Sequence, residues 1–231
     1  MLAFIAAESR EFDGFLANAE RVERLDWPVD FARRIWRRGE AAILAANGPG
    51  PKLAARAAAV AREKVELTGL VSTGFCGGLD AALQPCDIFV ASEVAGPDLR
   101  FPAKTPAFDG SAGIKSGVLL SVDRVASDAR EKSELRRSGA AAVEMEAAGV
   151  ASKAMEWNIP FFCVRVVTDT ADESLPLDFN RLRDEEGRFS RSRIIGAALR
   201  RPAVFPGLMR LDSRTKKAAR VLGDFVASCR F

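Results

Sequence analysis

Residues 143–173 read VEMEAAGVASKAMEWNIPFFCVRVVTDTADE. The pattern predicts a strand at 141–143, an amphipathic helix with apolar residues at spacings of three and four, and a buried strand at Phe161–Val167. Glu144 and Glu146 stand where the first strand gives way to the helix, and Asp169 follows the second strand. In open α/β sheets, ligands bind at such strand ends. We therefore expect the chemistry of the protein at these carboxylates.

Arg165 is the one charged residue inside the apolar run 161–167. A strand of this kind is covered on both faces, so its guanidinium should be buried. A buried charge needs a partner of opposite sign. We expect Arg165 to orient a carboxylate and not to bind a ligand itself.

The rest of the chain alternates strand and helix patterns, which predicts an α/β fold in three layers. The segment from Gly96 to Gly113 contains three prolines and is expected to be a loop. The expected strands are 2–6, 31–36, 41–46, 67–72, 87–93 and 115–121, and the expected helices begin at Glu8, after Pro51, at Ser127 and in the tail, where apolar residues recur from Ala218 to Cys229.

Composition limits the possible functions. The chain has 231 residues, 48% hydrophobic and 28% charged, with apolar runs from end to end, which favours one domain covering 1–231. It begins with an apolar run that has no basic region before it and is too short for a signal peptide or a membrane span, so we expect a cytoplasmic protein. No histidine is present, which excludes a Ser-His-Asp triad and argues against a zinc site. Acid–base chemistry must fall to carboxylates, lysine or cysteine.

The net charge of +3 does not by itself indicate nucleic acid, and RNA-reading aromatic strings are absent. The segment 181–220, however, carries ten Arg and two Lys against four acidic residues. Such a segment is most often a solvated face. The alternative is a surface with weak contact to acidic lipid head groups or to a phosphate-bearing ligand.

Four motifs in order carry a resemblance to a known family: VSTGFCGGL at 71–79, CDIFVASE at 86–93, AVEMEA at 142–147 and IPFFCVRVVTD at 159–169. Over residues 2–175 the chain resembles the purine and uridine phosphorylase superfamily, above all its methylthioadenosine/S-adenosylhomocysteine nucleosidases. RVVTDTADESLP at 165–176 and the basic tail are similar to hopanoid-associated phosphorylases.

The resemblance implies a three-layer α/β/α sandwich with a central mixed β-sheet. It also implies an enzyme that cleaves the N-glycosidic bond of an adenine nucleoside with a substituted 5′ position, by phosphorolysis or hydrolysis. In the hopanoid-associated branch the substrate would be an adenosylated hopane lipid. Members of the superfamily assemble as homo-oligomers, and no cofactor is implied beyond inorganic phosphate as a co-substrate.

The resemblance also implies roles at the carboxylates. Cleavage passes through an oxocarbenium-like sugar, and the purine needs a proton as it leaves. Asp169, helped by Thr168, matches the acid that protonates the purine. Glu146 matches the acceptor for the ribose hydroxyls and Met145 the residue on the sugar face, with Glu144 in support.

The group that serves the nucleophile stays open between Glu8 and Glu11, which share the start of one helix. The glycine segment 74–78, with Gly74 and Phe75, should bring backbone N–H groups near the ribose or the anion.

Two positions depart from the family pattern. Phe75 stands where relatives carry serine, and Ser72 stands where bacterial purine phosphorylases carry a phosphate-binding arginine. Phosphate binding would then fall to Arg10, Arg33 or Arg34. Val125 occupies the base pocket without an aromatic ring to stack on adenine. These changes leave a non-catalytic nucleoside-binding relative as the alternative.

Overall fold

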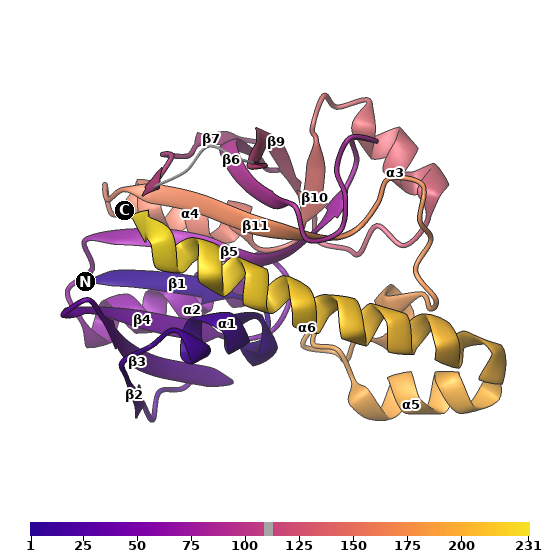
Figure 1. Cartoon of the computed structure of the whole chain (residues 1–231), viewed down its shortest axis with the longest axis horizontal. Coiled ribbons are helices and arrows are strands. Elements are labelled where there is room, and N and C mark those ends of the chain that lie inside the picture. Colours follow the sequence, from indigo (N-terminus) through magenta and orange to yellow (C-terminus); the bar gives the residue numbers. More distant parts are fainter. Residues whose placement is uncertain (109–112) are drawn as a thin grey trace.

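β1 (Leu2–Ala6) lies at the centre of a mixed sheet, parallel to β4 (Glu40–Ala46) on one side and to β5 (Gly69–Gly78) on the other. The computed structural model describes residues 1–108 and 113–231. The strand order of the large sheet is β10-β9-β6-β11-β5-β1-β4-β3-β2, with β7 paired to the edge of β6 (Figure 1). The other strands are β2 (Arg21–Arg24), β3 (Phe31–Arg37), β6 (Ile88–Ala95), β7 (Arg100–Pro102), β9 (Lys115–Ser121), β10 (Ala142–Glu144) and β11 (Phe161–Asp169).

Helices cover both faces of the sheet, as expected for three layers. The helices α2 (Pro51–Lys64) and α4 (Ala147–Glu156) pack on one face, while α1 (Asp13–Ala17) and α6 (Phe205–Ser228) pack on the other. Successive strand residues point to opposite faces, so each buried strand feeds both cores. The three-layer sandwich with a central mixed sheet is confirmed.

Glycine allows the closest helix contacts. At Gly149 an added Cβ would overlap the backbone of Pro51, at the start of α2. At Gly223 of α6 it would overlap the backbone of Gly14 in α1. Both helix pairs therefore pack backbone against backbone. These contacts fix the positions of α1, which follows β1, and of α2, which follows β4.

β10 closes one part of the sheet into a ring. It pairs in parallel with β9 and also antiparallel with the end of β5, through Gly77 and Gly78. The strands β10, β9, β6, β11 and β5 thus form a closed ring. This closure carries the end of β10, with Glu144, toward β11, with Arg165.

Several boundaries differ from the prediction. β5 does not end at residue 72 as predicted but continues through the glycine segment 74–78, because β11 and β10 hydrogen-bond to it from both sides. The helix expected at Glu8 divides into a 3-10 turn, η1 (Ser9–Phe12), and the short α1. β2 was not predicted.

The expected loop 96–113 contains β7 and a second short strand, β8 (Ala107–Phe108), which pairs with β12 (Cys229–Arg230). Proline is tolerated in β7 because the strand lies at the sheet edge. Residues 109–112 of this segment lie outside the described residues.

After β11 the chain leaves the sheet. The helix α5 (Arg191–Arg200) and the first half of α6 extend together beyond the ends of the strands, on the same side as α3 (Ala129–Arg136) (Figure 1). Two 3-10 turns, η2 (Phe179–Leu182) and η3 (Pro202–Val204), complete this region. Within the described ranges, no helix is long and apolar enough to cross a membrane.

Candidate active site

A cavity of about 400 Å³ lies where β1, β5, β10 and β11 end. The residues that line it come from segments far apart in the sequence. Nine of the ten predicted site residues are among them: Glu8, Glu11, Phe75, Val125, Glu144, Met145, Glu146, Thr168 and Asp169. The tenth, Gly74, does not line the cavity but lies behind it.

Glu144 is held by the start of α4. Its Oε2 accepts the backbone N–H of Glu146 at 2.8 Å, and the N–H of Ala147 lies 3.1 Å from Oε1 and 3.0 Å from Oε2. It also accepts from the guanidinium of Arg165. Both oxygens are therefore occupied by protein donors, which fits a supporting residue better than a ligand-binding one.

Arg165 is fully buried. Besides Glu144, it donates to the carbonyl of Thr73 at 2.8 Å and to the hydroxyl of Ser72 at 2.6 Å, and its Nη1 lies 3.6 Å from Glu146 Oε2. Burial works against the cation, but the carboxylates of Glu144 and Glu146 outweigh it and raise the pKa of Arg165. The predicted buried arginine with carboxylate partners is present.

Glu146 has a different environment from Glu144. Its Oε1 accepts the backbone N–H of Gly50 at 3.0 Å. Burial, and then the charge of Glu144, raise the pKa of Glu146 to about 8, although Arg165 acts in the opposite direction. Glu146 thus lines the cavity with an oxygen, Oε2, that no close protein donor occupies in the described part of the chain.

Glu8 and Glu11, which the sequence left as alternatives, have unequal surroundings. Glu11 is 4% exposed, and its two oxygens accept the backbone N–H groups of Glu8 and Phe75, each at 2.8 Å. Burial raises the pKa of Glu11. Glu8 is half-buried and forms an ion pair with Arg10 at 2.6 Å. A buried, oriented carboxylate with a raised pKa is the better general base.

Gly74 explains how Glu11 reaches this position. Its φ of +128° lies in the region that favours glycine. An added Cβ would overlap the Glu11 carboxylate and lie 3.0 Å from Arg165 Nη1. Gly74 therefore makes room for the carboxylate instead of offering an N–H to a ligand, and the N–H that acts here belongs to Phe75.

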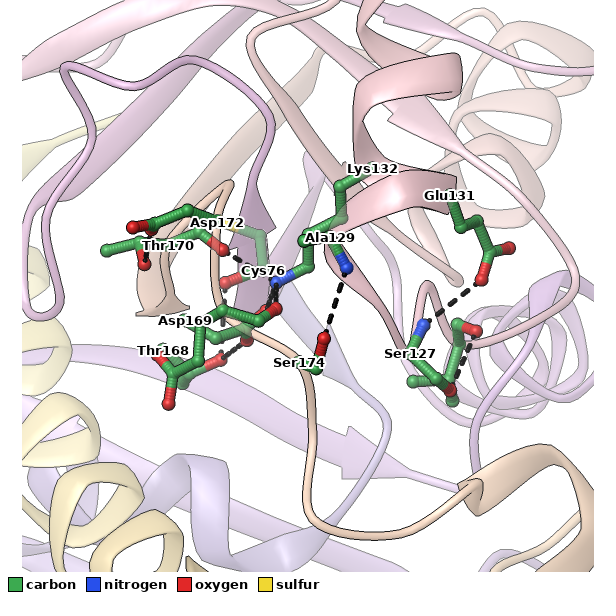
Figure 2. A network of polar contacts seen from close by, with 12 residues as sticks. Cys76, Ser127, Ala129, Glu131, Lys132, Thr168, Asp169, Thr170, Asp172 and Ser174 are labelled. Carbon is green, nitrogen blue, oxygen red and sulfur yellow. Dashed lines mark hydrogen bonds and ion pairs between the residues drawn. The ribbon is translucent and has the colours of Figure 1, made fainter.

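Asp169 faces the cavity from the end of β11 and has two donors (Figure 2). Thr168 Oγ1 donates to its Oδ1 at 2.7 Å, and Lys132 Nζ donates to its Oδ2 at 2.5 Å. Sequence reasoning missed Lys132. On the predicted helix 127–137 it reads as one of many solvated charges, and only the tertiary structure shows it buried.

The outer part of the cavity is apolar. Val125 lies at its wall, and its backbone is fixed by the Asn180 side chain through hydrogen bonds of 2.8 and 2.9 Å. The apolar and aromatic side chains that complete this part belong to residues 175–211: Leu175, Phe179, Phe189, Ile194, Leu208 and Leu211. The sequence signal was the apolar residues interleaved with the arginines of 181–220, which charge counting alone overlooks.

Carboxylates dominate the polar lining. Six acidic residues line the cavity against two arginines, Arg10 and Arg124, and each arginine is already paired with a glutamate, at 2.6 and 2.8 Å. Arg33 and Arg34, the other phosphate candidates, lie on β3 and do not line it. Among the described residues, no group of three or more His, Cys, Asp or Glu is placed to hold a metal ion.

The protein is a three-layer α/β sandwich with a closed mixed sheet and carboxylates at its strand ends. A family model described as "Phosphorylase superfamily" matches residues 97–200. The 5'-methylthioadenosine/S-adenosylhomocysteine nucleosidase of Exiguobacterium sp. is 25% identical over 166 residues, which cover 60% of this chain and 71% of that protein. The nucleosidase of the same name from Glaesserella parasuis is 29% identical over 161 residues, which cover 58% of this chain and 70% of that protein.

Solved structures agree on the fold. The nucleosidase from Neisseria meningitidis in complex with methylthio-immucillin-A has a TM-score of 0.74 at 23% identity, covering 98% of this chain and 96% of that chain. A putative nucleosidase from Borrelia burgdorferi bound to adenine also has a TM-score of 0.74, at 18% identity, covering 99% and 98%. The resemblance to the phosphorylase superfamily and its nucleosidases, predicted from the sequence, is confirmed.

Proposed function

We propose that this protein is an enzyme that hydrolyses the N-glycosidic bond of an adenine nucleoside carrying an apolar 5′ substituent. The observation that carries the proposal is the meeting of Glu11, Glu146 and Asp169 at one cavity, each in a different environment. Carboxylates with different surroundings can divide the acid, base and binding roles of glycoside cleavage. The nucleosidase relatives support the same reaction.

The division of roles follows from the contacts. Glu11 removes a proton from a water molecule, whose oxygen attacks C1′ of the sugar. The C1′–N9 bond breaks with its electron pair passing to the purine, and Asp169 delivers a proton to the base. Glu146 accepts hydrogen bonds from the ribose hydroxyls through its Oε2. These hydrogen bonds become stronger as positive charge develops on the sugar. Met145 covers one face of the sugar.

The charge of the cavity favours water over phosphate as nucleophile. Six acidic side chains face it, while Arg10 and Arg124 are already paired with glutamates. A phosphate dianion would meet repulsion there, whereas an oxocarbenium-like sugar would be stabilised. Phosphorolysis is the second candidate, with Arg10 as the phosphate contact at the cavity.

The apolar outer part of the cavity supports an apolar 5′ group. Leu175, Phe179 and Leu208 line the cavity with apolar side chains, which offer no charged partner to a 5′ substituent. The resemblance to hopanoid-associated phosphorylases agrees with this, and an adenosylated hopane lipid is one substrate of that class.

Release of adenine, followed by chromatography, tests the proposal. The panel is adenosine, 5′-methylthioadenosine, S-adenosylhomocysteine and a 5′-deoxy-5′-alkylthioadenosine with a chain of about eight carbons, each with and without inorganic phosphate. We expect release without phosphate and a preference for the alkyl compound over S-adenosylhomocysteine, whose 5′ group is charged. Tight binding of all four with no release would instead show a non-catalytic nucleoside-binding protein.

A second proposal concerns the hairpin of α5 and α6. Four of its large apolar side chains are strongly exposed: Ile195 at 60%, Leu199 at 66%, Phe205 at 42% and Met209 at 72%. Arg200, Arg201 and Arg210 are exposed beside them. Apolar side chains flanked by arginines suit an anionic lipid surface, where each cation contributes about 1 kcal/mol. We infer weak membrane-surface contact here, close to the apolar mouth of the cavity.

Sedimentation with vesicles tests this contact. Binding is expected to vesicles containing about 30% phosphatidylserine, to fall with added salt, and to be lost when Arg200, Arg201 and Arg210 are changed to Glu. In the matched control, Lys52, Arg56 and Lys64, which are exposed on α2, are changed to Glu. This variant should bind the vesicles as the parent protein does. If the protein does not bind vesicles but self-associates through the hairpin, the membrane contact is contradicted, and the hairpin binds a second copy of the chain instead. A cytoplasmic location and homo-oligomeric assembly, also expected from the sequence, stay predictions.

A further inference from the structure

Lys132 is fully buried on α3, and its ammonium group has three acceptors (Figure 2). These are Asp169 Oδ2 at 2.5 Å, the carbonyl of Thr170 at 2.7 Å and the carbonyl of Glu173 at 2.9 Å. Three acceptors match the three N–H donors of a lysine ammonium. The side chain is therefore completely satisfied and fixed in place.

Asp169 supplies the negative charge in this arrangement, because the other two acceptors are backbone carbonyls. A buried lysine without a carboxylate partner would carry a large desolvation cost. In the described part of the chain, Asp169 is the side-chain acceptor of Lys132, and Asp169 also lines the cavity. The pair thus connects the interior of the fold to the group that faces the ligand.

The same lysine holds the segment that follows Asp169. Ala129 N donates to Ser174 Oγ at 3.3 Å, and Leu175 N donates to the Ser127 carbonyl at 2.8 Å, so the start of α3 is bonded to residues 174–175 as well. Leu175 itself lines the cavity. Lys132 therefore lies between the acid and the apolar wall and ties both to one helix.

We propose that Lys132 is a positioning residue for leaving-group protonation, a role that rests on the proposed function. Asp169 is a carboxylate in the ion pair with Lys132, so it takes up one proton from solvent when the nucleoside binds. When Asp169 passes that proton to the departing base, the base carries the proton and the carboxylate of the ion pair is restored. The fixed ammonium of Lys132 stabilises that carboxylate and holds its oxygens in place, while Thr168 Oγ1 orients the other oxygen. Lys132 keeps its own three protons throughout and does not touch the substrate.

Two substrates separate this role from a structural one. Adenine needs a proton as it leaves, whereas the 4-nitrophenolate of a 4-nitrophenyl riboside leaves as a stable anion without one. In Lys132→Met, kcat for adenine release should fall at least about 100-fold, the scale of general acid catalysis, with KM within a few-fold. Release of 4-nitrophenol should stay within about threefold of the parent protein.

Matched variants complete the experiment. Asp169→Asn should show the same split between the two substrates. Lys153→Met, which removes a half-buried lysine paired with Glu156 at 2.6 Å on α4, should leave both rates unchanged. Equal losses on both substrates in Lys132→Met would overturn the positioning role and leave a structural one. Failure of the parent protein to release adenine would instead contradict the proposed function.

A double variant covers the case in which Lys132→Met does not fold. Lys132→Met with Asp169→Asn removes both charges, so no buried charge is left unpaired. Compared with Asp169→Asn alone, the double variant should lose no further adenine release and should keep the 4-nitrophenol rate. An additional loss of about tenfold or more on adenine release would show that Lys132 acts independently of Asp169 and would overturn the proposal.

Discussion

Glu11 Oε1 accepts the backbone N–H of Phe75 at 2.8 Å, which joins the first 3-10 turn to the central strand β5 through a carboxylate. The other oxygen accepts from Glu8 N at the same distance. These two bonds orient a buried carboxylate toward the cavity. The bond from Phe75 does not depend on its side chain, because it is made by the backbone.

The base role of Glu11 predicts that Glu11→Gln loses adenine release by about 100- to 10,000-fold, since the amide cannot take a proton from water. Glu8→Gln, at the half-buried ion pair with Arg10, should lose less than about tenfold. Steady-state rates for the two variants on the same substrate make the comparison. A larger loss in Glu8→Gln would transfer the role to Glu8.

Gly74→Ala should damage both stability and activity. The φ of +128° is strained for alanine, at a cost of about 1–3 kcal/mol, and the new Cβ would displace Glu11. Gly139→Ala is the matched control, because Gly139 also has a positive φ, +87°, but no atom lies within 4 Å of its added Cβ. Thermal unfolding and adenine release are measured for both. Equal activity in the two variants would show that activity does not depend on where the Glu11 carboxylate is held.

The raised pKa of Glu146 predicts that the free energy of unfolding falls as the pH rises. Its pKa is raised from 4.5 to about 8 in the folded chain, with burial as the main cause. Below both values the carboxyl is protonated in the folded and unfolded states, so it contributes nothing. Between them the unfolded chain releases the proton and the folded chain keeps it, which disfavours folding by on the order of 3 kcal/mol at pH 7.

Glu146→Gln should therefore be more stable than the parent protein at pH 8, and the difference should shrink toward pH 5. Activity should fall in the same variant, because an amide cannot ionise to the carboxylate that accepts strongly from the ribose hydroxyls as positive charge develops on the sugar. Denaturant unfolding at pH 5, 6, 7 and 8 measures the difference. Glu156→Gln, an exposed control on α4, should not reproduce this trend. A difference that is constant with pH would refute the buried titration.

Arg165→Met should lower the free energy of unfolding by about 3–5 kcal/mol, because it leaves Glu144 buried without its cation. Arg130→Ala removes an exposed ion pair with Glu134 and should cost less than about 1 kcal/mol. Chemical unfolding curves compare the two. A loss in Arg165→Met as small as that in Arg130→Ala would show that the buried pair is not essential to the fold.

Periodicity and strand ends predicted the parts of this fold that depend on local pattern. The strand–helix–strand order of residues 141–169, the buried Arg165 and the gathering of Glu144, Glu146 and Asp169 at neighbouring strand ends follow from that stretch. The three-layer sandwich is set by which faces are apolar, and that information is local.

Tertiary placement is what the sequence did not reveal. Lys132 on a charged helix looks like any solvated lysine until α3 packs against the end of β11. Gly74 looks like a turn residue until β10 and β11 pair on either side of β5. Phe179 and Phe189 belong to a segment whose charge hides its apolar side chains, so their place at the cavity depends on the path of the chain after β11.

The most direct measurement is the cleavage of 5′-methylthioadenosine or its longer alkyl analogue in H₂¹⁸O, with mass analysis of the sugar. Hydrolysis with water activated by Glu11 predicts free adenine and one ¹⁸O atom in the sugar product, with no need for phosphate. A phosphorylated sugar formed only when phosphate is present, or no adenine released at all, would contradict the account.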